Sequence, residues 1–157
     1  MLLRAFLPCL VLATLASCAV QPVDEESLVA RAVDHAALGF IQQSIRKPSE
    51  HAADAVEVWA APEAASAYGA LVPGDAAASF PSESMIVKRH YVDDQPDGLT
   101  VMAKVAGFNP TGGDWWWARI NNDGQAEPAG AVGFCIDCHT RTTRSDWVFG
   151  VDPADRP

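Results

Sequence analysis

Two cysteines and a histidine near the C-terminus form the stretch with the clearest capacity for chemistry. Cys135-Ile136-Asp137-Cys138-His139 has the C-x-x-C-H spacing of c-type haem attachment. Three residues apart, the thiols project to the same side of a tight turn or helix start, and each can add to one haem vinyl group. The imidazole of His139 then reaches the iron. The motif predicts one covalently bound haem c.

The cysteine pair has two other possible uses. An oxidising compartment would allow a disulfide between Cys135 and Cys138. A zinc ion could also use these thiols, but it would need a fourth ligand from a distant part of the chain. Haem attachment is the use in which the histidine that directly follows Cys138 has a role.

The position of the motif bears on the second axial ligand of the iron. No methionine or histidine follows His139, so the arrangement of ordinary electron-transfer cytochromes, with a methionine far downstream, is impossible. A sixth ligand must come from earlier in the chain, or the iron is five-coordinate. An open iron face suits small-molecule binding or turnover, and two strong ligands suit electron transfer. The candidates for a sixth ligand are His35, His51, Met85, His90 and Met102.

The N-terminus predicts export. Arg4 is followed by a short apolar run from Ala5 to Ala16, which is too short for a permanent membrane span. Leu15-Ala16-Ser17-Cys18 resembles a bacterial lipobox, so residues 1–17 are predicted to be a signal peptide and Cys18 the lipid-bearing first residue of a mature chain in the periplasm. Cleavage after Ala16 or Ala19 instead would leave a soluble periplasmic protein. The residue after Cys18 resembles those of lipoproteins sent to the outer membrane.

Length and charge limit the remaining possibilities. The chain has 157 residues, which fits a tether at 18–23 and one domain at 24–157. It carries 20 Asp plus Glu against 11 Lys plus Arg, and the basic residues are scattered. Nucleic acid is therefore not an expected partner, and the only expected membrane contact is the lipid anchor.

The elements that must position the motif are mainly strands. Helices are expected from Asp24 to about Ser44 and from Pro62 to about Gly69, with a loop from Val72 to Ser84. Turn residues separate the expected strands. The fold class is therefore α+β, a mainly antiparallel sheet with one or two packed helices. The expected strands are Val56 to Trp59, Met85 to Val92, Leu99 to Val105, and Trp115 to Asn121.

From about Val56 to Val151 the sequence resembles the cytochrome P-460 family, which includes the cytochromes c′-beta. The similarity rests on the order and spacing of several short motifs, and it implies a mostly antiparallel, often dimeric fold with one five-coordinate haem held by His139. The matching motifs are Phe80-Pro81, Val87-Lys88, Met102-Ala103-Lys104, Gly113-Asp114-Trp115, the C-x-x-C-H motif and Asp146-Trp147-Val148-Phe149.

The resemblance also implies two alternative activities on small nitrogen species. Catalytic members bond a strand lysine to the haem macrocycle and oxidise hydroxylamine, and Lys88 occupies the matching position. The cytochromes c′-beta cap an open iron face with aromatic side chains and bind nitric oxide, for which Phe80 and Phe40 are candidates. A periplasmic electron acceptor is the expected partner of the oxidation. Two residues depart from the family pattern. Glu83 stands two residues after Pro81, where the family commonly has glycine, and Arg89 follows Lys88, where the family commonly has an acidic residue.

Several further side chains are candidates for the haem pocket. Hydroxylamine oxidation needs a proton acceptor, which a carboxylate such as Glu83, Asp114 or Glu127 would provide. His51 or His90 would serve instead, or would ligate the iron. Alternation on a strand places Trp115, Trp117 and Arg119 on one face and Trp116 on the other, as pocket walls or as core. Arg119, Arg141 and Arg144 could pair with haem propionates or with neighbouring carboxylates.

Overall fold

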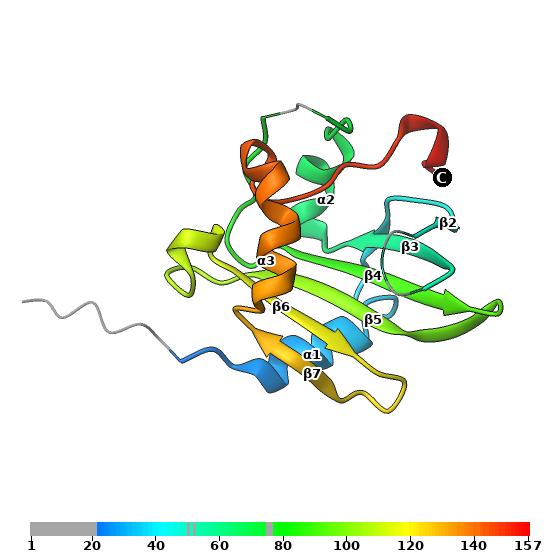
Figure 1. Cartoon of the computed structure of the whole chain (residues 1–157), viewed down its shortest axis with the longest axis horizontal. Coiled ribbons are helices and arrows are strands. Elements are labelled where there is room, and N and C mark those ends of the chain that lie inside the picture. Colours follow the sequence, from blue (N-terminus) through cyan, green and yellow to red (C-terminus); the bar gives the residue numbers. More distant parts are fainter. Residues whose placement is uncertain (1–21, 50, 52, 75–76) are drawn as a thin grey trace, which may run out of the picture.

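A computed structural model describes residues 22–49, 51, 53–74 and 77–157 of the chain (Figure 1). The predicted signal peptide and Cys18 lie outside the described residues. The elements are α1 (Glu25–Val33), β1 (Ile41–Gln42), β2 (Lys47–Pro48), β3 (Ala55–Ala60), α2 (Pro62–Gly69), β4 (Met85–Val92), β5 (Gln95–Lys104), η1 (Pro110–Gly112), β6 (Trp115–Ile120), β7 (Ala126–Gly130), α3 (Gly133–His139), η2 (Thr140–Ser145) and η3 (Pro153–Asp155). The predicted α+β class is confirmed.

The strands form one antiparallel sheet. Within the described residues it has seven strands in the order β1-β3-β4-β5-β6-β7, and β2 also pairs with β3. The register places Lys88 of β4 opposite Thr100 of β5, and Met102 of β5 opposite Trp117 of β6. Because side chains alternate along a strand, this register decides which of them face the haem motif.

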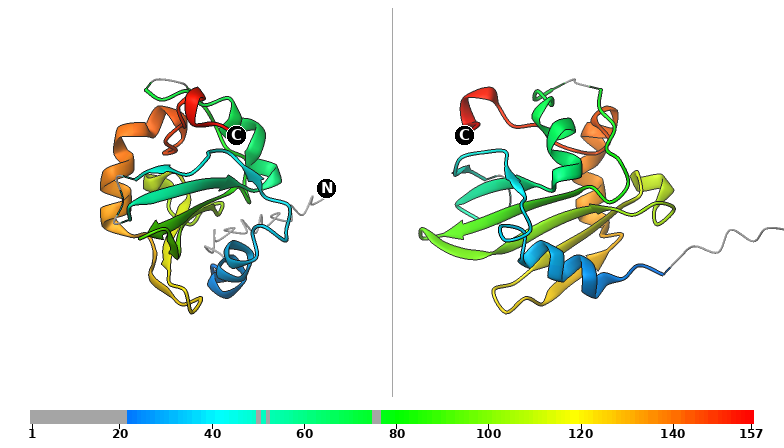
Figure 2. Two further views of the ribbon diagram at one scale, coloured as in Figure 1. Left: turned by 90° about the vertical axis from the view of Figure 1, so that its right-hand side faces the viewer. Right: turned by 180° about the vertical axis from the view of Figure 1, so that it is seen from behind.

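Both faces of the sheet are covered. One face packs against α2, α3 and the C-terminal segment, and α1 packs against the other (Figures 1 and 2). Met102 is only 6% exposed although it alternates with the buried Val101 and Ala103. Successive residues of this strand are therefore buried on both faces of the sheet, because the second face carries its own layer.

The first helix is shorter than predicted. Asp24 caps it by accepting a hydrogen bond from the Ser27 amide at 3.0 Å, and the helix ends at Val33 instead of continuing to Ser44. Gly39 then adopts a φ of 75°, in the left-handed region that favours glycine. This turn brings Phe40 back into the core against Ala32. The chain therefore leaves the helix early, because the turn at Gly39 buries Phe40, which one long helix to Ser44 would not do.

Two features of the second half also differ from the sequence prediction. The link between β4 and β5 is only Asp93-Asp94, both with positive φ, so β5 begins at Gln95. A two-residue turn of this kind matches the twist of a hairpin. The chain also forms β7, paired with β6, before α3 begins. This strand leads directly into the haem motif.

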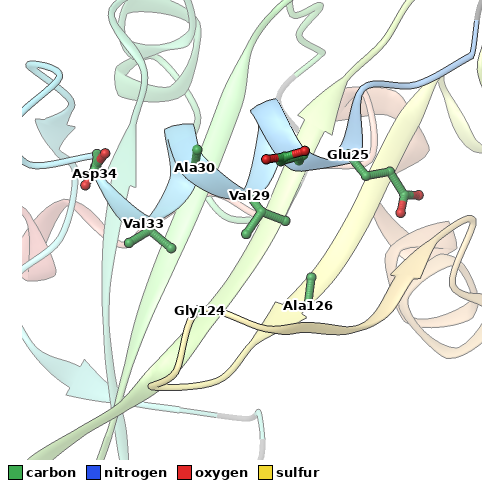
Figure 3. A pocket seen from close by; sticks show the side chains of 8 residues that line it. Glu25, Val29, Ala30, Val33, Asp34, Gly124 and Ala126 are labelled. Atoms are coloured by element: carbon green, nitrogen blue, oxygen red, sulfur yellow. The ribbon is translucent and has the colours of Figure 1, made fainter.

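A shallow groove runs between α1 and the turn into β7 (Figure 3). Val29 and Val33 line it from the helix, and Gly124 and Ala126 line it from the hairpin. It lies on the α1 side of the sheet, away from α3. Among the residues that the structure describes, no helix has the length and apolar character needed to cross a bilayer.

Candidate haem site

The two cysteines of the motif lie on one helix and are both free thiols. Cys135 is half-buried and Cys138 is exposed, one turn apart on α3. Burial raises the pKa of the Cys135 thiol to about 11. No group of three or more His, Cys, Asp or Glu side chains arranged to hold a metal ion is found in the described part of the chain.

His139 ends α3 and is only 5% exposed. Its Nδ1 lies 2.5 Å from the carbonyl oxygen of Trp147, so Nδ1 carries the proton and donates it. The other ring nitrogen, Nε2, is then the one with a lone pair for iron, the usual arrangement of a metal-ligating histidine. Burial also lowers the pKa of His139 to about 4, so the ring is neutral at physiological pH.

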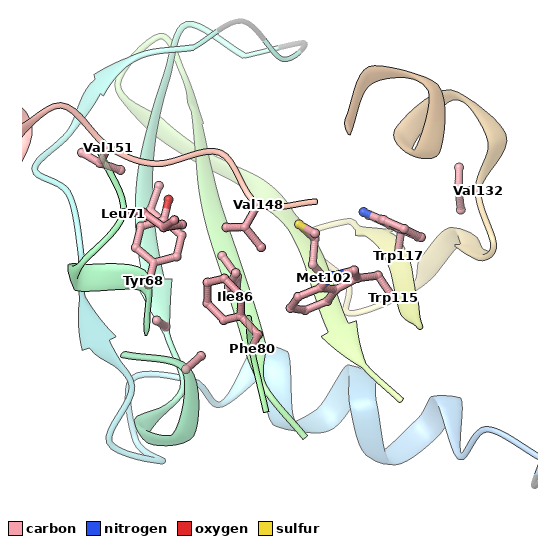
Figure 4. Close-up of a cluster of buried hydrophobic side chains, with 13 residues drawn as sticks. Tyr68, Leu71, Phe80, Ile86, Met102, Trp115, Trp117, Val132, Val148 and Val151 are labelled. Atoms are coloured by element: carbon pink, nitrogen blue, oxygen red, sulfur yellow. The ribbon is translucent and has the colours of Figure 1, made fainter. Parts of the chain in front are cut away.

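Apolar and aromatic side chains form a wall between α3 and the sheet (Figure 4). Trp117 lies edge-on to His139, with ring centroids 6.3 Å apart, and Phe149 approaches the same ring at 4.9 Å. The indole N–H of Trp117 is buried and has no hydrogen-bond partner among the described residues. Phe80, Ile86, Met102, Trp115, Val132 and Val148 belong to the same cluster.

Lys88 lies on the sheet face that α3 covers. It alternates along β4 with Val87, which packs on the opposite face. The positive charge of Lys88 helps to lower the pKa of His51, His90 and His139, and it acts on the Cys135 thiol as well. The ammonium is therefore within electrostatic range of both ends of the haem motif.

A polar network adjoins Lys88. Arg119 donates from Nη1 to Nδ1 of His90 at 3.0 Å and from Nη2 to Asp97 Oδ2 at 2.9 Å. Nε2 of His90 must then carry the proton, and it donates to Thr100 Oγ1 at 2.9 Å. Burial, followed by the charge of Arg119, lowers the pKa of His90 to about 4. This part of the site holds a neutral imidazole with both nitrogens bonded.

The structure separates the five candidates for a sixth ligand. His35 packs between Phe40 and Trp59, and Met85 belongs to the cluster on the α1 face, so both lie away from α3. His90 has both ring nitrogens engaged. His51 lies beside His90 with centroids 5.9 Å apart, and Met102 lies in the wall with Trp117.

The other candidates are distributed over the molecule. Phe80 belongs to the wall, edge-on to Trp115, whereas Phe40 packs on the α1 face and cannot share a cap with it. The backbones of Glu83 and Asp114 take positive φ in turns, and Glu127 is an exposed residue of β7. The structure links a different carboxylate, Asp97, to His90 through Arg119.

The three tryptophans and three arginines divide as follows. Trp115 and Trp117 lie on the α3 face, and Trp116 lies on the α1 face, where it donates to Glu25 Oε1 at 3.0 Å. Arg119 pairs with a neighbouring carboxylate, that of Asp97. The guanidinium of Arg141 donates to the Cys138 carbonyl at 3.2 Å and lies 5.5 Å from the Phe149 ring centroid. Arg144 lines a pocket between η2 and residues 72–74.

Sequence reasoning missed the residues that orient the two histidines of the site, His139 and His90. Neither the Trp147 carbonyl nor Thr100 carries a local pattern that marks it as a partner of a histidine. The tertiary fold brings each of them into place. The one available signal was the position of Asp146-Trp147 within a run shared with a known family.

These residues fit a haem. They supply two free thiols on one side of a helix, a neutral imidazole with Nε2 open, an apolar wall and an unpaired indole donor. The class of protein that this fold and motif fit is a haem-binding cytochrome.

The comparison with known families agrees. The sequence matches the family model described as Cytochrome P460 over residues 37–150, and the chain belongs to this family. Membership implies a haem cofactor and chemistry on small nitrogen species. No curated protein sequence matches the chain.

Proposed function

We propose that the protein is an exported monohaem cytochrome that oxidises hydroxylamine at an open iron face. Cys135 and Cys138 bind the haem covalently and His139 ligates the iron. Lys88 is bonded to the macrocycle. When bound, the haem supplies an iron that accepts the nitrogen ligand and passes its electrons to a periplasmic acceptor.

The position of Lys88 carries this proposal. It shares the sheet face and the electrostatic neighbourhood of Cys135 and His139, as a lysine that reaches the haem must. The other two lysines of the chain occupy other strands. Lys47 lies 3.5 Å from Asp155, and Lys104 binds Asp146. Lys88 is the lysine whose charge acts on both Cys135 and His139.

The ligand candidates support an open iron face. His35 and Met85 lie across the sheet, and the imidazole of His90 is saturated by Arg119 and Thr100. Electron transfer alone, the alternative function, would need His51 or Met102 as a sixth ligand. A six-coordinate, low-spin spectrum would identify that function.

A second candidate function is reversible binding of nitric oxide without the lysine bond. The apolar wall formed with Phe80, Met102 and Trp115 favours it, because a small uncharged gas needs no polar partner. The two candidates differ in one covalent bond. Forming that bond removes one hydrogen from Lys88 Nζ and one from a macrocycle carbon, and an external oxidant takes the two electrons.

The absorption spectrum and intact mass of the haem-loaded protein test the proposal. We expect a red-shifted, broadened Soret band in the reduced protein and a mass two hydrogens lower than that of the unbonded holoprotein. Lys88→Ala should show an ordinary c-type spectrum and lose hydroxylamine turnover. Lys47→Ala, which also removes a lysine, should retain both properties.

An ordinary five-coordinate spectrum in the wild type would exclude the crosslink. Titration of the ferrous protein with nitric oxide would then test the second function. Unchanged turnover in Lys88→Ala would also contradict the enzymatic proposal.

The compartment belongs to the same proposal. We place the protein in the periplasm, anchored to the outer membrane through lipid on Cys18. A periplasmic electron acceptor and a second copy of the chain are the proposed partners. The predicted signal peptide and lipobox support the location, and family resemblance supports the dimer.

A further inference from the structure

A half-buried ion pair joins β5 to the segment after η2. Lys104 Nζ lies 2.6 Å from Asp146 Oδ1 and 2.5 Å from Asp146 Oδ2. The two side chains are only 15% and 13% exposed. Removing either charge would leave its partner largely shielded from water without a counter-charge, so this pair fixes its surroundings more strongly than a fully exposed ion pair does.

Asp146 is held by two further elements. Its Oδ2 accepts a hydrogen bond from the Phe80 amide at 2.8 Å, and its carbonyl accepts one from Trp115 Nε1 at 2.8 Å. Asp146 and Trp147 have φ angles of 55° and 67°, two successive residues in the left-handed region. Such a conformation persists when surrounding contacts determine it. Here the contacts come from β5, β6 and the loop before β4.

The same dipeptide supplies the acceptor for His139. The Trp147 carbonyl, one residue beyond Asp146, accepts the His139 Nδ1 proton at 2.5 Å. The Trp147 indole is also confined, because it packs against the backbone of Gly113. The direction of the carbonyl is therefore set by a segment that the Lys104–Asp146 pair anchors.

We propose that Lys104 and Asp146 are positioning residues that set how strongly His139 binds the iron. They hold the Trp147 carbonyl against Nδ1–H without touching the haem. A strong hydrogen bond at Nδ1 raises the basicity of the ligating nitrogen. A more basic ligand stabilises ferric over ferrous iron and lowers the reduction potential. This inference rests on iron ligation by His139 and not on hydroxylamine oxidation.

The experiment measures the reduction potential of the haem-loaded protein and its ferrous iron–histidine stretching frequency by resonance Raman spectroscopy. Lys104→Met keeps the aliphatic length and removes the charge. We expect a higher potential, with the ferrous-to-ferric ratio at a fixed applied potential rising about fivefold, as for loss of one hydrogen bond. The stretching frequency should fall. Lys104→Arg, which retains the charge, should restore both values toward wild type.

Lys47→Met is the matched control, since it breaks the ion pair with Asp155 far from His139, and it should leave both readouts unchanged. If Lys104→Met does not fold, Asp146→Asn replaces it, because an amide oxygen can still accept from the Phe80 amide. A folded, haem-loaded variant of either kind with wild-type potential and frequency overturns the proposal. If neither variant folds, a wild-type frequency typical of a histidine without an Nδ1 acceptor overturns it.

These readouts are separate from those of the proposed function. Loss of the lysine bond changes the Soret band and the mass in Lys88→Ala. Loss of the Lys104–Asp146 pair changes the potential and the iron–histidine frequency. Either idea can therefore fail without the other.

Discussion

Arg119 donates to Nδ1 of His90 and thereby forces that imidazole to be neutral and protonated on Nε2. The ring is fully buried, and Nε2–H donates to Thr100, which lies opposite Lys88 in the sheet register. A cation held by Asp97 thus fixes the tautomer of a histidine at the edge of the haem site. Because the folded protein keeps this imidazole neutral, the free energy of unfolding should fall at acidic pH.

The first prediction concerns pH and His90. Its ordinary pKa is 6.5, and burial together with Arg119 and Lys88 lowers the pKa to about 4, while Asp97 opposes the shift. Below pH 6.5 the unfolded chain takes up a proton that the folded protein refuses. The free energy of unfolding should therefore fall between pH 6.5 and 4, by on the order of 3 kcal/mol from this residue.

Denaturant unfolding of the haem-loaded protein across this pH range measures that slope. His51, whose ring lies next to His90, also has a lowered pKa, so the wild-type slope includes more than one group. His90→Gln isolates the share of His90 and should flatten the curve. An equal slope in wild type and variant would contradict the assignment.

The second prediction concerns Gly113. Its φ is 68°, and a Cβ atom placed there would lie 2.7 Å from Nε1 of Trp147. Gly113→Ala should lower the free energy of unfolding by about 3 kcal/mol, from backbone strain and overpacking together. Gly124→Ala is the matched control, because Gly124 also has positive φ, at 78°, and its Cβ would meet nothing within 4 Å.

Thermal or denaturant unfolding of both glycine variants gives the comparison. The control should lose only about 1 kcal/mol, the cost of the left-handed backbone alone. Equal losses in the two variants would mean that the packing of Trp147 against Gly113 adds nothing.

The third prediction concerns covalent attachment. Wild-type protein made in a host competent for c-type haem attachment should keep its haem on a denaturing gel. The double variant Cys135→Ala with Cys138→Ala should lose it there, because neither thiol of the motif is left to bond a vinyl group. His139→Ala, with both thiols intact, should keep the haem on the gel and change its spectrum. Haem that stays with the double variant would refute thioether attachment.

The fourth prediction concerns Cys18. The mature protein from a lipoprotein-processing host should begin at a lipidated Cys18 and partition into detergent. Cys18→Ser should abolish both the lipid mass and the partitioning. Mass spectrometry of the N-terminus measures this directly, and an unmodified N-terminus near Ala16 or Ala19 would show ordinary signal cleavage.

Local pattern predicted much of the fold. The strand Met85–Val92 and the helix Pro62–Gly69 have the predicted bounds, because turn residues next to the first and a proline at the start of the second are local signals. The strand β7 carries Pro128 and little apolar alternation, so its pairing with β6 had no signal in the sequence. The end of α1 was also missed, because burial of Phe40 depends on distant contacts.

The site divides in the same way. Cys135, Cys138 and His139 are recognisable in the sequence because haem attachment requires their C-x-x-C-H spacing. The partner of His139, the carbonyl of Trp147, is a backbone atom of the kind that every residue has. No residue type marks it, and only the position of Asp146 and Lys104 in space selects it.

The sheet separates two sets of side chains by a single layer of backbone. Val87, Val101 and Trp116 pack toward α1, and their immediate neighbours along the strands face the haem motif. The α1 layer can therefore be redesigned for thermostability, with volume-conserving substitutions, while the surroundings of the iron stay as they are. The reverse holds for ligand preference, which can be engineered from the α3 layer. The protein offers two nearly independent design surfaces on one set of strands.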